Sequence, residues 1–447
     1  PIEAIPLFKL ALETNPQIEQ FWLSYIGALI TLERFDEAKR VLVEGEKSGV
    51  SAEKLDALNQ RLQGSIPSDT NKTAKGRTLT EERKAQDSSS SATPPQDQLN
   101  HLLVHYQANR LEEAEELAIL LTQQFPDHPF AWKVLGAVLQ QTGRVNESLL
   151  PMQESADLSP QDAEAHSNLG VTLQELGRLD DAEASFRKAI ALKPDYAAAH
   201  SNLGVTLKEL GRLDDSEASF KEAIALEPDF VEAHYNLGNT LKELGRLDDA
   251  EASYKEAIAL KPDYAEAHYN LGVTLQELGK LDDAEASYRK ALALKPDHIE
   301  AHSNLGVTLQ ELGRLEDAEA SYRKALALKP DYAEAHNNLG VTLKELGRLD
   351  DAEASYREAI TLKPDYAEAH SNLGVTLQDL GRLDDAETSY RKAIALKPGY
   401  AEAHYNLGVT LEAQGRLGEA EVSYRKAIAL KPDYAEAHSN LGSTLKA

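Results

Sequence analysis

The sequence of 447 residues contains no cysteine. This absence excludes disulfide bonds, thiolate nucleophiles and cysteine-bound zinc or iron–sulfur sites. Aromatic residues are scarce, at 6%, and no apolar run approaches the roughly 18 residues that a membrane-spanning helix needs. The sequence also shows no secretory signal peptide. We therefore expect a cytoplasmic protein that does not enter membranes.

Positive charge is also in short supply. The chain has 47 lysines and arginines against 74 aspartates and glutamates, and its net charge is -27. A surface of this sign repels nucleic acid, whose binding depends on neutralising phosphates, and it disfavours anionic membranes. We expect neither as a partner. The acidity has two interpretations, namely a solvated exterior that keeps a long protein soluble and a field that attracts basic partners.

The main feature of the sequence is a repeat of 34 residues. The stretch "AEAHSNLGVTLQELGRLDDAEASFRKAIALKPDY" occupies residues 163–196 and returns with small changes every 34 residues. Self-similarity at a fixed period indicates a solenoid rather than several globular domains. The predicted organisation is a diverged repeat segment at 1–63, a flexible linker rich in Ser, Pro and Gly at 64–96, two diverged units at 97–162, eight near-identical units at 163–434 and an incomplete unit at 435–447.

Each unit reads as two helices. In the unit 265–298, apolar residues at helical spacing predict a first helix, and Gly279 supplies the left-handed residue that ends it. A second helix then runs to Pro296. Asp263 and Asp282 are the expected N-caps of the two helices. We expect the large side chain of Tyr288 to fill the space between the two helices. Because one pair of helices cannot bury its own apolar face, neighbouring units must stack.

This pattern resembles the tetratricopeptide repeat. The resemblance rests on the 34-residue period, on Leu271 and Gly272, on Ala284 and Ala291, and on the aromatic and proline positions already named. It implies an all-α fold, a right-handed superhelical α-solenoid of helix–turn–helix repeats. The copies depart from the family in one respect, because they carry His where the family usually has a large aromatic residue.

Those histidines recur every 34 residues from His166 to His438. A zinc site needs several ligands about 2.0–2.1 Å from one ion, whereas equivalent residues of successive units lie at least roughly 8–10 Å apart. We therefore expect no metal site. The histidines are predicted to pack at the helix interface with one ring nitrogen bonded locally, and a pH effect on stability is the alternative.

An asparagine follows two residues after each of these histidines. The repeats are similar to the repeat arm of O-linked N-acetylglucosamine transferases and to large bacterial tetratricopeptide-repeat proteins. The resemblance implies that these asparagines face inward and grip the backbone of an extended peptide, since a carboxamide matches the N–H and C=O of a peptide unit. Alternatively, each Asn only bonds the adjacent helix. The candidate residues are Asn168, Asn202, Asn236, Asn270, Asn304, Asn338, Asn372, Asn406 and Asn440.

The positions at which the copies differ cluster on the same predicted face. One residue before each Asn the sequence alternates between Ser, Tyr and Asn, and six residues after it between Gln, Lys and Glu. A binding surface would vary in this way, and drift at exposed positions is the rival explanation. The further candidates for peptide contact are Tyr235, Tyr269, Tyr405, Lys208, Lys242 and Lys344.

No catalytic constellation and no glycine-rich phosphate loop is evident, so we expect no enzyme activity in this chain and no cofactor. The favoured function is a scaffold that binds a protein or peptide partner in extended conformation. The alternative is the substrate-recognition arm of an O-glycosyltransferase, or less plausibly of a sulfotransferase or methyltransferase, whose catalytic domain would follow Ala447. End-to-end self-association of the near-identical units is a third expectation.

Overall fold

A computed structural model describes residues 93–446 and, before them, only Trp22, Leu23, Tyr25, Ile26, Leu29, residues 38–42, Gly45, Ser48 and Leu55. The chain divides into two compact units, Pro1–Ser90 and Ser91–Ala447. The linker expected at 64–96 lies almost wholly outside the described residues, as does most of the diverged segment expected at 1–63.

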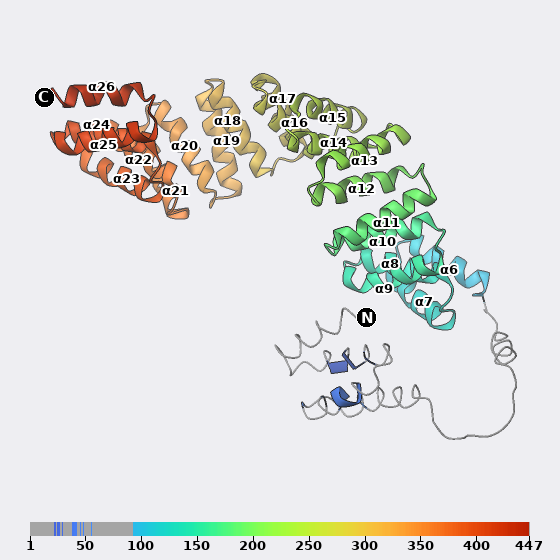
Figure 1. Ribbon diagram of the computed structural model, residues 1–447. Helices are drawn as coiled ribbons and strands as arrows, with labels where there is room; N and C mark the ends of the chain where they lie inside the picture. The colour runs from blue at the N-terminus through green and yellow to red at the C-terminus, as the bar shows by residue number, and fades with distance from the viewer. Residues whose placement is uncertain are drawn as a thin grey trace, which may run out of the picture. The chain divides into compact units, whose positions relative to one another are not determined.

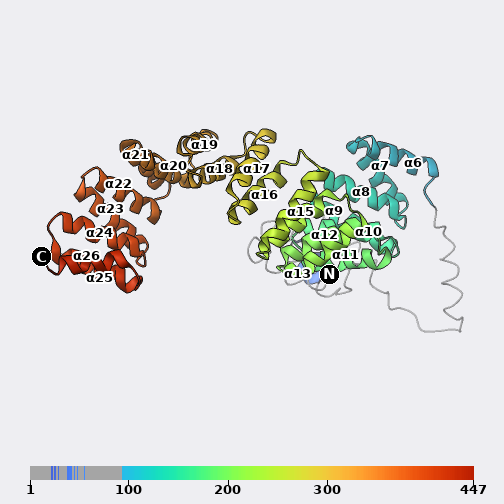
Figure 2. The same cartoon turned by 90° about the horizontal axis from the view of Figure 1, so that it is seen from above.

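Residues 93–446 form α-helices without any strand, in the order α6 to α26 (Figures 1 and 2). They are a first and a second helix in alternation, and we call the whole stack the array. The first helices are α6 (Gln96–Gln107), α8 (Pro129–Gln141), α10 (Ala163–Glu175), α12 (Ala197–Glu209), α14 (Val231–Glu243), α16 (Ala265–Glu277), α18 (Ile299–Glu311), α20 (Ala333–Glu345), α22 (Ala367–Asp379), α24 (Ala401–Ala413) and α26 (Ala435–Thr444). The second helices are α7 (Leu111–Gln124), α9 (Val145–Leu158), α11 (Leu179–Leu192), α13 (Leu213–Leu226), α15 (Leu247–Leu260), α17 (Leu281–Leu294), α19 (Leu315–Leu328), α21 (Leu349–Leu362), α23 (Leu383–Leu396) and α25 (Leu417–Leu430).

The turn between the two helices of a unit has the predicted glycine. Gly279 has φ +72°, and the corresponding glycine of every unit from Gly143 to Gly415 is also left-handed. A residue with a Cβ is disfavoured in this region, so the glycine ends the first helix without strain. The predicted first and second helices of each unit are confirmed.

The predicted N-caps of the unit 265–298 are wrong. The residues at the cap positions are Tyr264 and Lys280, and neither side chain caps its helix. Asp263 lies one residue too early to cap, and Asp282 lies inside the first turn of α17. Only where an aspartate stands directly before the helix does it cap, as Asp162 does by accepting from the backbone N–H groups of Glu164 and Ala165.

An ion-pair network holds the start of the second helix instead of a cap. Arg314 precedes α19, and its guanidinium contacts Asp317 in the first turn at 2.5 Å and Glu285 of the preceding unit at 2.6 Å. These partners raise the pKa of Arg314, with Asp317 the larger influence. The network therefore joins each second helix to its neighbour while placing acidic charge at the helix N-terminus, where the helix dipole favours it.

The core of the array consists of three clusters of buried residues, each of which spans more than one unit. Tyr288 is fully buried against Gly272, and a Cβ on that glycine would lie 2.7 Å from the tyrosine ring. The longest cluster runs from Phe220 to Tyr424 and includes leucines from every first helix between them. Neighbouring units therefore share their core, as expected for a solenoid whose single repeats cannot bury their own apolar faces.

The helices are packed unequally on the two sides of the array. The backbones of successive first helices lie close together, as those of α10 and α12 do, whereas within residues 93–446 the backbones of successive second helices lie farther apart. A side-chain ion pair still joins two of these, from Arg391 of α23 to Glu419 of α25 at 3.4 Å. None of the described helices combines the length and the apolar character needed to cross a membrane.

Candidate functional site

The histidine series has the predicted structural role. In every unit from 163 onward the ring Nε2 lies 2.9–3.2 Å from the carbonyl oxygen of the proline six residues earlier, as His302 does with Pro296 at 2.9 Å. Trp132 makes the same bond from its indole N–H to Pro126 at 2.7 Å. The histidines thus replace the family's aromatic residue and keep its hydrogen bond.

Burial affects the titration of several of these imidazoles. The pKa of His302 is lowered, first by burial and then, to a smaller degree, by the positive charge of Lys324, while the Pro296 carbonyl opposes the shift. The pKa values of His370 and His404 are lowered for the same reason. Across the described part of the chain no three His, Asp or Glu side chains are grouped so that they could hold a metal ion.

The asparagines of the first helices fall into two classes. All are half-buried, but four of them donate a hydrogen bond from Nδ2 to the first helix of the preceding unit. We call these the cross-bonded asparagines. They are Asn270 (to Tyr235 Oη, 2.9 Å), Asn304 (to Tyr269 Oη, 3.2 Å), Asn372 (to Asn337 Oδ1, 3.0 Å) and Asn440 (to Tyr405 Oη, 3.2 Å).

The remaining five have no partner for Nδ2 within residues 93–446, and we call them the open asparagines: Asn168, Asn202, Asn236, Asn338 and Asn406. The difference follows from the residue 35 positions earlier. That residue is Tyr or Asn for each cross-bonded asparagine, and Ser for every open one from Asn202 onward. A serine side chain is too short to reach the next unit's carboxamide.

The rings of the predicted tyrosines pack within their own units. The ring of Tyr235 packs 6.0 Å from Tyr254 and 4.9 Å from Tyr264, measured between centroids. Tyr269 packs similarly on Tyr288 and His298, and Tyr405 on Tyr424 and Tyr434. Their hydroxyls accept from the asparagine of the next unit, so variation at this position changes how neighbouring units are joined.

Two of the predicted lysines are also paired across units. Lys208 lies 3.1 Å from Glu243, and Lys344 lies 3.9 Å from Asp379. Gln310 takes the corresponding position on α18 and donates to Glu345 at 3.2 Å. For Lys242 the described residues provide no ion pair. The structure thus brings the asparagine row and the lysine row onto the same first helices, with acidic residues of the next unit beside the lysines.

A hollow of about 380 Å³ opens on this face beside Asn338, and we call it the Asn338 hollow. Its lining comes from α18, α19 and α20. Tyr322 lines it, and the hydroxyl of this tyrosine is buried without a hydrogen-bond partner among the described residues. Burial raises the pKa of Tyr322 above its ordinary value, so the group remains a neutral phenol and a potential donor. The lining residues are Val307, Gln310, Glu311, Tyr322, Asn338, Val341 and Glu345.

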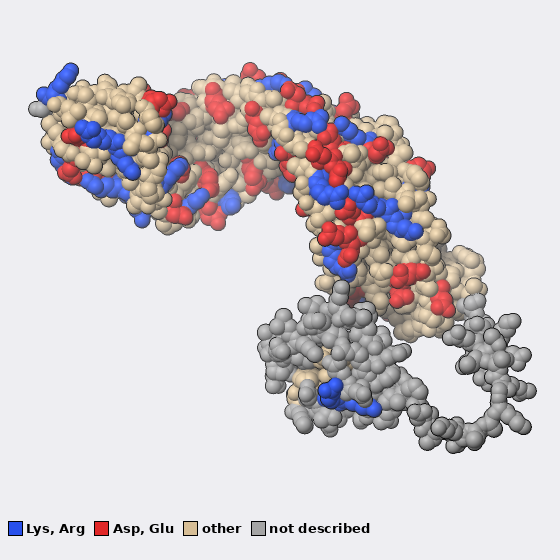
Figure 3. All heavy atoms as spheres, in the orientation of Figure 1, with Lys and Arg blue, Asp and Glu red and all other residues tan. Residues whose placement is uncertain are grey.

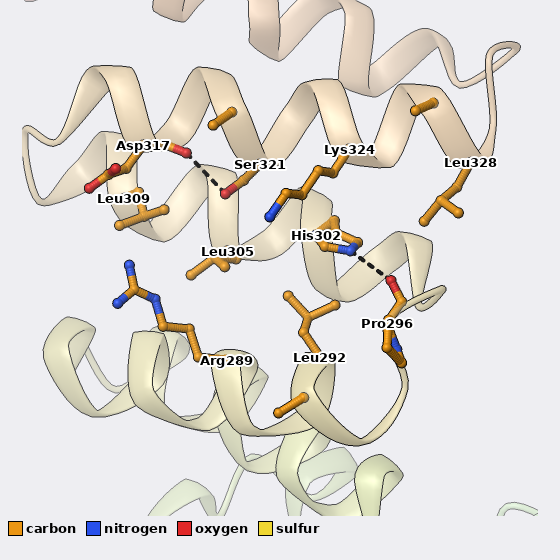
Figure 4. Close-up of a pocket in the computed structure, with 13 residues that line it drawn as sticks. Arg289, Leu292, Pro296, His302, Leu305, Leu309, Asp317, Ser321, Lys324 and Leu328 are labelled. Atoms are coloured by element: carbon orange, nitrogen blue, oxygen red, sulfur yellow. Dashed lines mark hydrogen bonds between the residues drawn. The ribbon is translucent and has the colours of Figure 1, made fainter.

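A larger cleft of about 680 Å³, which sequence reasoning missed, opens between the second helices α17 and α19 (Figure 4). Leu292 and Leu305 form apolar walls, and Arg289 and Lys324 extend into it. It lies where the backbones of these two successive second helices are separated. A smaller cleft at the equivalent place, beside His166, repeats it. The leucine spacing indicates burial in either case, so the sequence held no signal for an opening.

The surface of the array mixes both signs of charge (Figure 3). Acidic and basic side chains are interspersed on the visible face, and many of them are paired within or between units, as Glu251 is with Lys255 at 2.6 Å and Lys280 at 2.7 Å. These two lysines lower the pKa of Glu251.

Family models described as tetratricopeptide repeats match residues 161–229 and 263–331, residues 303–367 and 371–443, and residues 219–252, and a model described as a TPR repeat matches residues 238–279. No curated protein matches the chain significantly.

Several solved structures are similar to the chain. YrrB, described as a TPR protein with an unusual peptide-binding site, is 27% identical, with 42% of this chain and 96% of that one covered and a TM-score of 0.37. MamA is 30% identical, with 37% of this chain and 97% of that one covered and a TM-score of 0.35. A tetratricopeptide repeat protein from Parabacteroides merdae is 21% identical, with 56% and 98% covered and a TM-score of 0.45.

Proposed function

Because the chain is a tetratricopeptide-repeat protein, and so a scaffold for protein interactions, we propose that it binds an extended peptide segment along its first helices. The backbones of successive first helices lie closer together than those of successive second helices. A stack with this difference curves toward its first helices, so they line the inner side. The proposed role is binding and involves no chemical step.

The observation that carries the proposal is the set of open asparagines. Each keeps an amide nitrogen that the fold does not use, on a half-buried face. Neighbouring helices lie roughly 8–10 Å apart, and an extended peptide rises about 3.3 Å per residue. Successive asparagines would therefore meet the peptide backbone about every third residue. Asn168, Asn202 and Asn236 form the longest uninterrupted open run.

The free energy of these hydrogen bonds limits the affinity that the open asparagines can provide by themselves. A net hydrogen bond contributes about 0.5–1.5 kcal/mol, so five open asparagines supply about 5 kcal/mol before ordering costs. A dissociation constant of 1 μM requires about 8 kcal/mol. The carboxamides can therefore set position and register, and side-chain contacts of the partner must supply the rest of the affinity.

The test is selection of a random twelve-residue peptide library on the full chain, followed by calorimetry with the enriched peptides. One variant replaces all five open asparagines by Ala, and the matched control replaces the four cross-bonded ones. We expect the first to lower affinity tenfold or more without loss of stability. The control should lose stability, because cross-unit bonds are removed, and change affinity less than threefold.

Two results would contradict the proposal. Enrichment of no peptide on the wild-type chain would remove the binding function. Equal losses of affinity in the two variants would show that open and cross-bonded asparagines do not differ in peptide contact.

A further inference from the structure

The Asn338 hollow has a filled counterpart two units earlier in the same chain. There the hydroxyl of Tyr235 accepts from Asn270 Nδ2 at 2.9 Å, and the Tyr235 ring packs on Tyr254. Asn239 completes the group by accepting from the Tyr254 hydroxyl at 2.7 Å. Both tyrosine hydroxyls of this cluster are engaged, and Asn270 Nδ2 also donates to Asn239 Oδ1 at 2.9 Å. Two 34-residue periods later the same four positions are Ser303, Val307, Tyr322 and Asn338.

The two substitutions leave this second cluster incomplete. Ser303 is buried and lacks a ring, so no described residue reaches Asn338 Nδ2. Val307 cannot accept from Tyr322 as Asn239 accepts from Tyr254. Gln310 accepts from Thr342 at 3.1 Å and donates to Glu345, but no hydrogen bond joins it to Tyr322, whereas the corresponding Gln378 accepts from both Tyr390 and Thr410.

The cost of this arrangement points to a ligand. A buried hydroxyl without a partner destabilises the fold unless something binds it, and such groups are rare in folded proteins. Here Tyr322 and Asn338, which carry the unpartnered hydroxyl and the unpartnered amide, line one hollow together with Val307 and Val341. The hollow therefore offers a tyrosine side chain apolar surface and an amide donor like the one that Asn270 gives Tyr235.

We propose that the Asn338 hollow binds a tyrosine side chain of the partner peptide, in the place that Tyr235 and Tyr269 occupy within other units. The proposal rests on the proposed peptide-binding function. The ring packs between Val307 and Val341. Its hydroxyl accepts from Asn338 Nδ2 and shares a hydrogen bond with Tyr322, after a small shift that opens the buried hydroxyl to the ligand.

The charges around the hollow restrict the ligand further. Glu311 and Glu345 both line it, and Glu311 has no ion-pair partner among the described residues. Like charge disfavours an acidic side chain here, and it disfavours phosphotyrosine more strongly, since a phosphate brings almost two negative charges. The hollow therefore takes unmodified tyrosine, and phosphorylation of the partner would release it.

The experiment uses the same peptide library on the full chain. We expect enriched peptides to share a tyrosine. Calorimetry with the best of them should show a loss of at least fivefold when that tyrosine is replaced by Phe, since both polar groups then stay unpaired. Phosphorylating it should cost more than Phe.

On the protein side, Ser303→Tyr should fill the hollow from within. It should lower the affinity for the tyrosine peptide tenfold or more and raise the melting temperature, whereas Ser303→Thr, the matched control, should do neither. Should Ser303→Tyr fail to fold, Asn338→Ala takes its place, with a predicted loss of affinity at least fivefold greater for the tyrosine peptide than for the Phe peptide.

The outcomes separate the two proposals. Peptides that bind without a shared tyrosine, or that bind Ser303→Tyr as well as wild type, would refute the tyrosine site and leave the peptide scaffold standing. A chain that enriches no peptide would refute both.

Discussion

Three glycines of the unit 401–434 provide a strict test of the packing described here, because the same change to Ala should act differently at each. Gly408 lies in α24, Gly415 in the turn and Gly418 at the start of α25. A Cβ at Gly408 would lie 2.6 Å from the ring of Tyr424, whereas nothing lies within 4 Å at the other two positions. Gly415 has φ +76°.

The magnitudes follow from these surroundings. Tyr424 is fully buried and its hydroxyl donates to Glu412 at 2.6 Å, so the ring has little freedom to withdraw. We expect Gly408→Ala to cost about 1–3 kcal/mol or more by overpacking. Gly415→Ala should cost about 1–2 kcal/mol for the left-handed backbone. Gly418→Ala should stabilise by about 0.5–1 kcal/mol, since Ala is the better helix former.

The assay is amide hydrogen exchange of α24 and α25, because units near one end of a solenoid can open locally without unfolding the whole array. Urea unfolding of each variant provides a global control. The protection of these amides should be highest in Gly418→Ala, followed by the wild type, Gly415→Ala and finally Gly408→Ala. A neutral Gly408→Ala variant, or a destabilised Gly418→Ala variant, would refute the packing argument.

Three further predictions concern the joints between units. Because the pKa of His302 is lowered in the folded protein, this side chain is protonated more readily in the unfolded chain, so the stability of the fold should fall as the pH drops below about 6.5. The variant His302→Trp, which copies Trp132, should lose less stability than the wild type in urea melts between pH 7.5 and 5.5. Arg314→Ala should lower the urea midpoint only slightly, because Arg314 is exposed and Glu285 keeps Arg289 as a partner, and the difference should vanish in 1 M salt. Leu305→Ala should cost about 2–4 kcal/mol in urea unfolding, since Leu305 is buried in the shared core.

Some parts of this protein could be predicted from the sequence because they depend on local geometry. A 34-residue period with leucines at helical spacing requires stacked helix pairs, and Gly279 had to be left-handed because the first helix has to end there. The histidines could be recognised as structural because ligands one unit apart cannot converge on a metal ion. The apolar spacing does not locate the first residue of a helix to within one position. The prediction therefore missed that Asp263 lies one residue before the cap position.

The tertiary structure alone decided what the asparagines do. The nine asparagines occupy equivalent positions in the sequence and were therefore predicted to act alike. In the structure, however, four of the carboxamides donate hydrogen bonds within the array and five do not. The choice depends on a residue 35 positions away, which becomes a neighbour only when two units stack. Likewise, Ser303 and Val307 look like ordinary variation until Tyr322 and Asn338 are found beside the space they leave. Contacts between units depend on three-dimensional packing, so a repeat read one unit at a time does not contain them.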